Sequence, residues 1–482
     1  MQLNDASLLR QQCYINGEWV DADSGESIAI QNPATAAIIG QVPVMSTHET
    51  QAAIIAAEAA LPAWRALTAK ERSHKLKRWF ELLVEHQDDL ALLMTTEQGK
   101  PLSEAKGEVA YAASFIEWFS EEAKRVYGET IPGHQADKRL MVIKQSVGVT
   151  AAITPWNFPA AMITRKAAPA LAAGCTMVVK PAPQTPFTAL ALAELAERAG
   201  IPKGVFNVIT GDAIAIGNEL CANPVVRKLS FTGSTPVGIK LMQQCAPSLK
   251  KLSLELGGNA PFIVFNDADI DAAVAGAMIA KYRNAGQTCV CANRIYVQAE
   301  VYDEFAKKLA LAVSELTLGV GTEAGVTTGP LINVDALEKV EHHLADAISK
   351  GAKVIAGGKR SDLGGNFFEP TIITHADKSM LVAKEETFGP LAPLFKFNDV
   401  EEVIKQANDT EFGLAAYFYG RDISLVWKVS EALEYGMVGV NTGLISTEVA
   451  PFGGIKSSGL GREGGKSGIE EYLEMKYICM SV

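Results

Sequence analysis

Apolar residues follow two different spacings along the chain, and the change separates two kinds of region. After a short strand-like run at residues 14–20, apolar positions recur at helical spacing over residues 50–69, 80–94 and 109–123. Residues three and four apart share one face of a helix, so this spacing predicts helices with one buried face. The first third of the chain is therefore expected to be mostly helical.

From residue 148 onward, short continuous apolar runs alternate with helical segments. Helices are predicted over residues 185–200, 236–245 and 269–286, the first with a Thr-Pro start and a Gly stop. Continuous apolar runs are typical of parallel strands that helices cover on both faces, so the pattern predicts an α/β fold. The runs predicted as strands are residues 148–154, 175–179, 205–210, 228–233, 261–265, 294–298, 353–358, 391–397, 414–420 and 437–441.

The alternation restarts near the middle of the chain, which indicates a domain boundary. A chain of 482 residues exceeds the size at which one hydrophobic core usually keeps growing. We therefore expect two α/β domains that meet near Glu255–Pro261. Residues 138–144 and 471–482 alternate polar and apolar residues outside these domains, and such strands are able to pair with another subunit.

Composition and charge exclude several classes of function. Hydrophobic residues make up 48% and charged residues 21% of the chain, as in an ordinary packed enzyme. A net charge of −11 argues against a nucleic-acid partner, because phosphate binding needs a concentrated basic patch. No apolar run approaches the roughly 18 residues that span a bilayer, and the N-terminus lacks the basic start and apolar core of a secretory signal. We expect a cytoplasmic protein without a membrane partner.

The cysteines indicate free thiols rather than a disulfide framework. Their number is odd, and no export signal accompanies them. Cys289 and Cys291 lie in the stretch GQTCVCANR, but no second pair or histidine cluster follows, so we expect no metal site. The seven cysteines are Cys13, Cys175, Cys221, Cys245, Cys289, Cys291 and Cys479.

Three residues have the chemistry of catalytic groups. Cys289 is a possible nucleophile, although no histidine or lysine stands beside it in sequence, which makes a Cys–His protease a poor interpretation. Glu255 lies among apolar residues in KLSLELGGNAP, where burial would raise its pKa and suit it to activating water; the alternative is a paired structural glutamate. Asn157 stands between Pro155 and Pro159, as an amide donor to an oxyanion or as a loop cap.

Two segments are candidates for binding a nucleotide. Residues 459–464 match G-x-G-x-x-G, but no strand leads into them and too few residues follow for a βαβ unit, so we interpret them as an ordinary glycine-rich loop. In FTGSTPVG a strand runs into Gly233 and Ser234 and a helix opens with Pro236, which offers free amides to a phosphate. Lys180 ends another strand, at the edge where open α/β sheets bind ligands. An ordinary turn and a surface lysine are the alternatives.

Six motifs occur together in the order found in one family. ITPWNFP, VVKPAP, FTGST, LELGGNAP, GQTCVCANR and KEETFGP resemble the aldehyde dehydrogenase superfamily over essentially the whole chain. MITRKAAPALAAGC, YRNAGQTCVC, NFFEPTI, ETFGPLAP and PFGGIKSSGLGREG are most similar to its succinate-semialdehyde dehydrogenase branch.

The resemblance implies an aldehyde dehydrogenase-like α/β fold with three parts. It implies a Rossmann-type NAD(P)-binding domain at residues 1–124 and 145–256 and an α/β catalytic domain at 257–450. A small β oligomerisation element would comprise residues 125–144 and 467–482, in a homo-oligomer that is a tetramer or a dimer.

The resemblance also assigns roles to matching positions. Cys289 would attack the aldehyde, Asn157 and the Cys289 amide would hold the oxyanion, and Glu255 would activate the water that hydrolyses the thioester. Lys180 would bind the adenosine ribose region, Ser234 the pyrophosphate and Glu386 the nicotinamide ribose. The positions implied for NADP or NAD are Trp156, Lys180, Pro183, Gly233, Ser234, Glu386 and Phe388.

The implied substrate is a semialdehyde that carries a carboxylate, either succinate semialdehyde or its one-carbon-longer homologue glutarate semialdehyde. Arg165 and Arg283 match the arginines of the branch, with Ser446 as a third contact; a structural ion pair is the alternative for either arginine. Pro183 stands where NADP-preferring members have Ser and NAD-dependent members often have Glu. No carboxylate then repels the 2′-phosphate of NADP, but one phosphate contact is lost.

Two further interpretations and one further residue remain open. A member that transfers the acyl group to coenzyme A would not need Glu255 to activate water, and a non-catalytic member of the fold would need none of these groups. Cys291 lies two residues past Cys289, where an extended segment would put both side chains on the same side. It is either a small packing residue or a redox partner that captures oxidised Cys289 as a disulfide.

Overall fold

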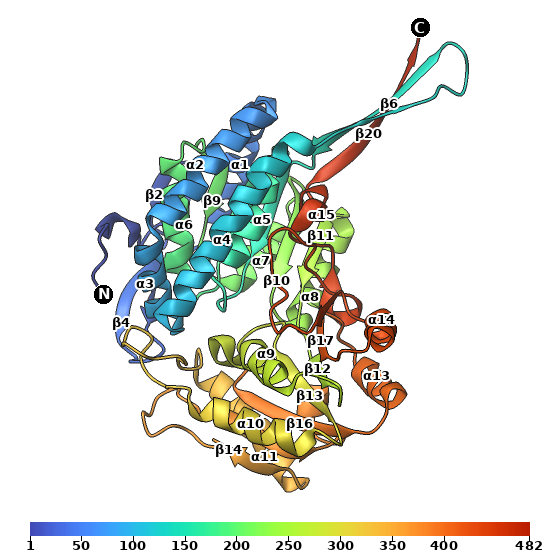
Figure 1. Ribbon diagram of the computed structural model, residues 1–482. Coiled ribbons are helices and arrows are strands. Elements are labelled where there is room, and N and C mark those ends of the chain that lie inside the picture. The colour runs from blue at the N-terminus through green and yellow to red at the C-terminus, as the bar shows by residue number, and fades with distance from the viewer.

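The computed structural model describes residues 1–482, and it consists of two α/β halves and a thin β arm that projects from one of them (Figure 1). The first half is built on an eight-stranded sheet whose five central strands are parallel. Short antiparallel strands extend it at both edges. In spatial order its strands are β19 (Gly459–Leu460), β11 (Lys251–Glu255), β10 (Val226–Thr232), β7 (Val149–Ile153), β8 (Thr176–Lys180), β9 (Phe206–Val208), β1 (Cys13–Ile15) and β2 (Glu18–Val20).

Helices cover both faces of this sheet, because each strand carries apolar residues on both of its sides. One face is covered by α2 (Ala69–Glu85), α3 (Gln87–Gln98), α4 (Leu102–Glu122), α5 (Ala161–Ala173) and α6 (Pro186–Arg198). The other is covered by α1 (Thr47–Ala66), α7 (Ala213–Ala222) and α8 (Thr235–Cys245). Every residue of α5 is buried, and its run of alanines lets the neighbouring helices approach closely.

The second half is built on a seven-stranded sheet that is parallel except for its first edge strand. In spatial order its strands are β14 (Lys353–Ala356), β15 (Thr371–Ala376), β16 (Leu391–Phe397), β13 (Ala292–Gln298), β12 (Ala260–Val264), β17 (Ala415–Tyr419) and β18 (Met437–Val440). One face packs on α9 (Ile270–Tyr282) and α10 (Tyr302–Ser314). The other packs on α11 (Val334–Ser349), α13 (Val400–Asn408) and α14 (Ile423–Ala432). The short helices α12 (Leu381–Lys384) and α15 (Gly465–Glu470) lie in connections.

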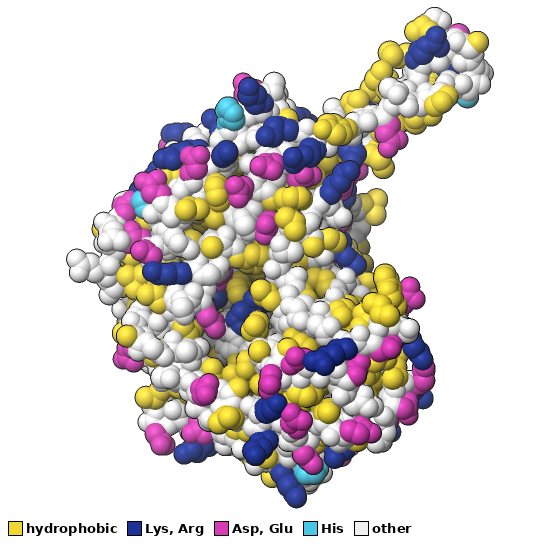
Figure 2. All heavy atoms as spheres, viewed as in Figure 1, with side chains coloured by type: hydrophobic (Ala, Val, Ile, Leu, Met, Phe, Trp, Pro, Cys, Tyr) yellow, Lys and Arg dark blue, Asp and Glu magenta, His cyan; other side chains and the backbone are white.

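The arm contains three antiparallel strands, β5 (Glu129–Ile131), β6 (Lys138–Ser146) and β20 (Leu473–Ser481). Figure 2 shows hydrophobic side chains exposed along it. Met475 is 76% exposed and Tyr477 is 56% exposed. A ribbon that exposes such side chains buries little of its own apolar surface, and isolated ribbons of this kind are marginal in water.

The turn chemistry explains several helix boundaries. The Glu49 carboxylate accepts a hydrogen bond from the Ser46 amide at 2.9 Å, and Glu71 accepts one from Thr68 at 2.7 Å. Each pair forms a capping box that satisfies amides at the start of α1 or α2. Helix α3 ends at Gly99, whose φ of 96° is the left-handed conformation that glycine adopts readily.

The sequence pattern was wrong at two helices. Residues 80–94 do not form one helix, because the chain breaks at His86 between α2 and α3. The helix predicted to reach residue 286 ends at Tyr282. Asn284 and Ala285 adopt φ values of 52° and 55°, a conformation that stops the helix. The Asn284 side chain accepts a hydrogen bond from Gln98, far away in sequence, so the local pattern did not show this turn.

Other elements were missing from the sequence prediction or differ from it. The hairpin β3 (Ser27–Gln31)–β4 (Ile38–Pro43) and strand β15 were not identified. The run at 14–20 is a tight hairpin, β1–β2, rather than one strand. No single helix is long and apolar enough to cross a membrane; only the pair α1 and α2, bent by 118°, passes that test when joined.

Candidate active site

The carboxyl ends of β10 and β11 and the start of β13 come together between the two halves. Figure 2 shows a hollow there with basic side chains inside it. A cavity of about 350 Å³ contains Cys289 on its wall. A second cavity, of about 270 Å³, is lined by Arg283 and Ser446, and Phe158 lines both. Sequence-predicted residues on the wall of the first cavity are Trp156, Asn157, Gly233, Ser234, Cys289, Glu386 and Phe388.

Cys289 lies in a turn that a rigid preceding segment holds. The turn follows Gly286, whose φ is 75° and where a Cβ atom would lie 2.3 Å from the Gly389 carbonyl oxygen. Only glycine fits that position. Burial raises the pKa of the Cys289 thiol to about 12, while Arg165 and Arg283 act in the opposite direction. The Cys289 thiol is therefore protonated near neutral pH.

Asn157 is fixed at the wall of the same cavity. Its side-chain Nδ2 donates a hydrogen bond to the Gln287 backbone carbonyl at 3.0 Å, and the Asn157 backbone carbonyl accepts one from Lys100 Nζ at 2.7 Å. An amide nitrogen carries two hydrogens, so one donor of Nδ2 is left for a ligand. The side chain is thus a rigid donor in the cavity that contains the Cys289 thiol.

Glu255 ends β11 and is only 2% exposed. Neither of its carboxylate oxygens has a hydrogen-bond partner. Burial raises the pKa of Glu255 well above its usual value, and the nearby Glu463 raises it further. A Cβ atom at Gly453 would lie 2.9 Å from Glu255 Oε1, so glycine keeps that side open. Glu255 does not line the Cys289 cavity itself but lies close enough to perturb the thiol.

Sequence reasoning missed Glu463, the residue that organises the region behind Glu255. It lies in the glycine-rich loop after β19 and is 4% exposed. Its Oε2 lies 2.5 Å from Arg165 Nε, and its other oxygen accepts a hydrogen bond from Lys166. Lys166 also donates to Thr232 at 2.6 Å. A buried acid between two cations stays ionised, and the pKa of Glu463 is lowered by them despite its burial. The only sequence signal was an acid within the discounted G-x-G-x-x-G match.

The two arginines implied for substrate binding have different surroundings. Arg165 is 1% exposed, pairs with Glu463 and lies 3.9 Å above the Phe452 ring, and it lines neither cavity. Its Nη2 has no hydrogen-bond partner. Arg283 lines the second cavity, lies 5.3 Å from the Phe158 ring and has no carboxylate within ion-pair distance. Glu104 and Glu108 line the same cavity, but Arg283 forms an ion pair with neither, so its guanidinium is available to an anionic ligand.

A residue not predicted from the sequence completes this second cavity. The Tyr111 hydroxyl is buried without a hydrogen-bond partner and lines the cavity together with Arg283 and Ser446. Buried hydroxyl groups are usually hydrogen-bonded, so the arrangement favours a polar ligand between the three side chains, in a cavity that Glu104 and Glu108 also line. Tyr111 had no sequence signal because α4 resembles any amphipathic helix.

The start of α8 has the features of a phosphate site. Ser234 precedes the helix, makes no side-chain cap and is followed by Pro236 in the first turn. The Ser234 side chain therefore leaves the first amides of α8 uncapped, and these amides lie at the positive end of the helix dipole. Lys180 ends β8, donates to the Pro181 carbonyl at 3.1 Å and is 4% exposed. Burial lowers the pKa of Lys180 to about 8.

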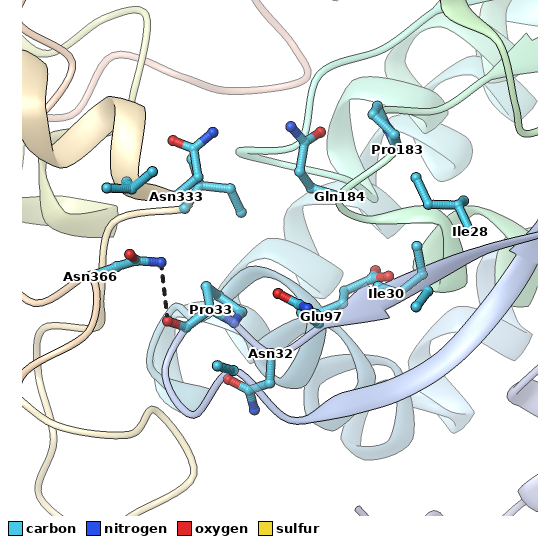
Figure 3. Close-up of a pocket in the computed structure, with 14 residues that line it drawn as sticks. Ile28, Ile30, Asn32, Pro33, Glu97, Pro183, Gln184, Asn333 and Asn366 are labelled. Carbon is cyan, nitrogen blue, oxygen red and sulfur yellow. Dashed lines mark hydrogen bonds between the residues drawn. The ribbon is translucent and has the colours of Figure 1, made fainter.

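Pro183 lines a different cavity from the one that holds Cys289. This third cavity, of about 510 Å³, lies between the β3 segment, residues 183–184 and loops of the second half (Figure 3). In Figure 3, Gln184 and Asn333 extend from opposite halves toward the space above Pro33. Pro183 lines only this third cavity and Lys180 lines none of the three, whereas the other implied cofactor positions line the Cys289 cavity.

Glu386 and Phe388 belong to one loop at the edge of the first cavity. Glu386 Oε1 accepts a hydrogen bond from the Gly258 amide at 3.1 Å. Burial raises the pKa of Glu386 to about 7. Phe388 has a φ of 55° and packs edge-to-face on Trp156 with ring centroids 5.6 Å apart.

Cys291 is fully buried. The expectation of an extended segment was wrong, because residues 288–290 form a turn in which the Cys291 amide donates to the Thr288 carbonyl at 3.1 Å. The Cys291 sulfur lies 3.4 Å from Lys281 Nζ. Its side chain therefore packs on α9, and the same-side argument from alternation does not apply.

Comparisons with known proteins identify the family of the chain. The sequence profile described as "Aldehyde dehydrogenase family" matches residues 19–478. The chain belongs to this family. A solved structure described as an E. coli NADP dependent enzyme has a TM-score of 0.99 and 70% identity over all of both chains, which confirms the predicted family fold.

Within the family, the chain is similar to enzymes named for semialdehydes. Glutarate-semialdehyde dehydrogenase of Pseudomonas putida is 72% identical over the whole of both chains. The NADP(+) succinate-semialdehyde dehydrogenase GabD of Escherichia coli is 70% identical, again over the whole of both. A succinate-semialdehyde dehydrogenase structure from Burkholderia pseudomallei has a TM-score of 0.99 at 64% identity over all of both chains.

Proposed function

We propose that this protein oxidises succinate semialdehyde to succinate with NADP or NAD, and that glutarate semialdehyde is the second candidate substrate. The observation that carries this proposal is Arg283. Its guanidinium lines a cavity that shares the Phe158 wall with the Cys289 cavity, and it forms no ion pair. Of the two carboxylates in this cavity, Glu108 is paired with Lys100, and Glu104 forms no ion pair. An aldehyde with a carboxylate at its far end fits two such adjoining spaces. The names of the relatives at 70% and 72% identity support the same choice.

The reaction begins with attack of the Cys289 sulfur on the aldehyde carbon. The thiol must first lose its proton, and the positive field of Arg165 and Arg283 favours the thiolate against the cost of burial. The carbonyl oxygen becomes an oxyanion, which the free hydrogen of Asn157 Nδ2 and the Cys289 amide stabilise. When bound, the nicotinamide supplies the acceptor for the hydride that leaves the same carbon.

Release of the product requires hydrolysis of the thioester on Cys289. We assign activation of the water to Glu255, because its raised pKa suits it to accept a proton near neutral pH. The carboxylate has no hydrogen-bond partner to give up when it does so. Glu463 stays ionised between Arg165 and Lys166 and disfavours a second negative charge on Glu255. The field of Glu463 thus makes Glu255 a stronger base once it is ionised.

The carboxylate of the substrate would lie between Arg283, Ser446 and Tyr111. Arg165 stays in the proposal as a second cation, because its Nη2 is unpartnered even though Nε is paired with Glu463. Its contribution would require the substrate to reach a side chain that is 1% exposed. Arg283 therefore makes the main contact.

The residues present fit a dinucleotide cofactor. The uncapped amides of α8 after Gly233 and Ser234 suit a pyrophosphate. The Glu386 carboxylate lines the same cavity from a different loop. Trp156 and Phe388 form an apolar wall beside Cys289 that suits a nicotinamide ring. Lys180 and Pro183 would contact the adenosine ribose, with no carboxylate at 183 to repel the 2′-phosphate of NADP.

Initial rates with succinate and glutarate semialdehydes, each with NADP and NAD, test the proposal directly. Oxidation of a semialdehyde at least tenfold faster in kcat/KM than butanal is expected, since a charge-assisted contact contributes about 1.5–3 kcal/mol. Equal rates for charged and neutral aldehydes would contradict it. Formation of an acyl-coenzyme A product when coenzyme A is added would favour the acyl-transfer alternative instead.

The arm supports a homo-oligomer. We infer that β5, β6 and β20 pack against another subunit, because their exposed apolar side chains have no core within the chain. The proposal covers a dimer or a tetramer in the cytoplasm. Light scattering coupled to gel filtration distinguishes the two, and Met475→Asp should shift the protein to a smaller species. A monomeric wild type would contradict the inference.

A further inference from the structure

Helix α11 brings an unassigned buried histidine to the back of the cofactor loop. Asp335 and Lys339, on successive turns of this helix, line the Cys289 cavity. His343 is one further turn along the same face. It is 1% exposed, whereas the neighbouring His342 is exposed. One face of α11 therefore runs from the cavity to the loop that carries Glu386 and Phe388.

His343 contacts two residues of that loop. Its Nδ1 lies 3.1 Å from the Thr387 hydroxyl, and its Nε2 lies 3.3 Å from Glu385 Oε2. A neutral imidazole satisfies both contacts, since Nδ1 accepts from the hydroxyl while Nε2–H donates to the carboxylate. Burial lowers the pKa of His343, which agrees with that neutral form. Lys339, Glu385 and His342 are the charged or titratable groups around it.

The loop lies between His343 and the cavity. Glu385 is extended, with φ −109° and ψ 144°, and successive side chains of an extended segment face opposite ways. Glu385 and Thr387 contact His343, and Glu386, Thr387 and Phe388 line the cavity. Phe388 has a φ of 55°, which is strained for a residue with a side chain. Such a conformation persists only where surrounding contacts hold it.

We propose that His343 is a positioning residue that holds the segment 385–388 so that Glu386 and Phe388 face the cofactor. The inference rests on the proposed use of these two residues for NADP or NAD. The contact to Thr387 is the important one, because both partners are buried. Glu385 is 56% exposed, and an ion pair at such a surface contributes little.

The test compares His343→Ala, His343→Gln and Glu385→Ala, with His342→Ala as the matched control. NADPH affinity is measured by fluorescence titration without aldehyde, and KM is then measured for cofactor and for semialdehyde separately. Loss of the buried hydrogen bond should weaken NADPH binding about tenfold in His343→Ala and raise the KM for cofactor to match, with the aldehyde KM unchanged. His343→Gln, which can both donate and accept, should recover most of the affinity. Glu385→Ala and His342→Ala should stay within about twofold of wild type.

Three outcomes separate the inference from its alternatives. NADPH affinity that is unchanged in His343→Ala overturns it, whatever the melting temperature does. Equal losses for cofactor and aldehyde, with no recovery in His343→Gln, mean that His343 only supports the fold, and this also overturns it. If His343→Ala does not fold, the other two variants decide. The inference then requires a small loss of NADPH affinity in His343→Gln and no loss in Glu385→Ala, and any other result overturns it. A wild type that binds NADPH but prefers neutral aldehydes contradicts the proposed substrate and leaves this inference standing.

Discussion

Replacing Arg283 by alanine separates recognition of the substrate carboxylate from stability of the fold. Arg283 forms no ion pair, so its removal breaks none, although its charge opposes the rise in the pKa of Glu104 that burial causes in the same cavity. Its main neighbour is the Phe158 ring at 5.3 Å. The substitution should therefore affect the binding of an anionic substrate and leave the melting temperature close to that of the wild type.

The magnitude follows from the contact that is lost. A hydrogen bond to a charged group contributes about 1.5–3 kcal/mol, and each 1.4 kcal/mol corresponds to about a tenfold change. The kcat/KM for succinate semialdehyde should fall roughly tenfold to a hundredfold, and that for butanal by less than about threefold. Arg283→Lys keeps the charge but loses the planar fork, so its loss should be intermediate.

Arg165→Ala is the matched comparison, because Arg165 is already paired with Glu463. Removing one partner of a buried ion pair lowers the free energy of unfolding by about 3–5 kcal/mol when nothing replaces it. Because Lys166 remains bonded to Glu463, the loss in Arg165→Ala should lie at or below that range. The variant should melt at a lower temperature and lose activity toward charged and neutral aldehydes alike.

The assay is a set of initial rates for four aldehydes that differ in charge and length, together with thermal melting of each variant. Equal losses of succinate semialdehyde and butanal oxidation in Arg283→Ala would refute the assignment of Arg283. So would a selective loss for charged aldehydes in Arg165→Ala with none in Arg283→Ala. That result would mean that the ion pair with Glu463 opens during substrate binding.

Three further predictions concern the chemistry at the thiol. Cys289→Ala should abolish oxidation and leave NADPH binding unchanged, and turnover within tenfold of wild type would show that the nucleophile is another residue. Glu255→Gln should slow thioester hydrolysis, so that a burst of reduced cofactor precedes slow turnover in a stopped-flow trace. Because the pKa of Glu255 is raised, the base form is lost as pH falls, and the wild-type hydrolysis rate should drop on the acid side while the variant shows no such drop. If Cys291 captures an oxidised Cys289, Cys291→Ser should lose activity in mild peroxide without recovery in dithiothreitol, because the oxidised Cys289 then has no thiol partner and oxidises further; loss and dithiothreitol recovery equal to wild type would make Cys291 a packing residue.

The local pattern of the chain determined much of the fold. Continuous apolar runs predicted the parallel strands β7, β8 and β12, because strands covered on both faces carry apolar residues on both sides. The turn before α8 was visible as a strand that ends in Gly-Ser followed by a proline, and each of those residues has a local conformational reason. The six motifs were sufficient for the family, since each is a short segment whose residue types the chemistry restricts.

The tertiary structure alone decided which of these residues meet. Glu463 lies 297 positions from the lysine that it bonds, and no local pattern relates an acid in a glycine-rich loop to a helix so far away. The end of α9 was hidden for the same reason, because the left-handed turn at Asn284 depends on a contact with Gln98. Pro183 follows Lys180 closely in sequence, yet it lines a separate cavity, since the loop after β8 turns toward the other half of the molecule. Sequence spacing sets which groups are available, whereas long-range packing sets their distances, their burial and therefore their charge.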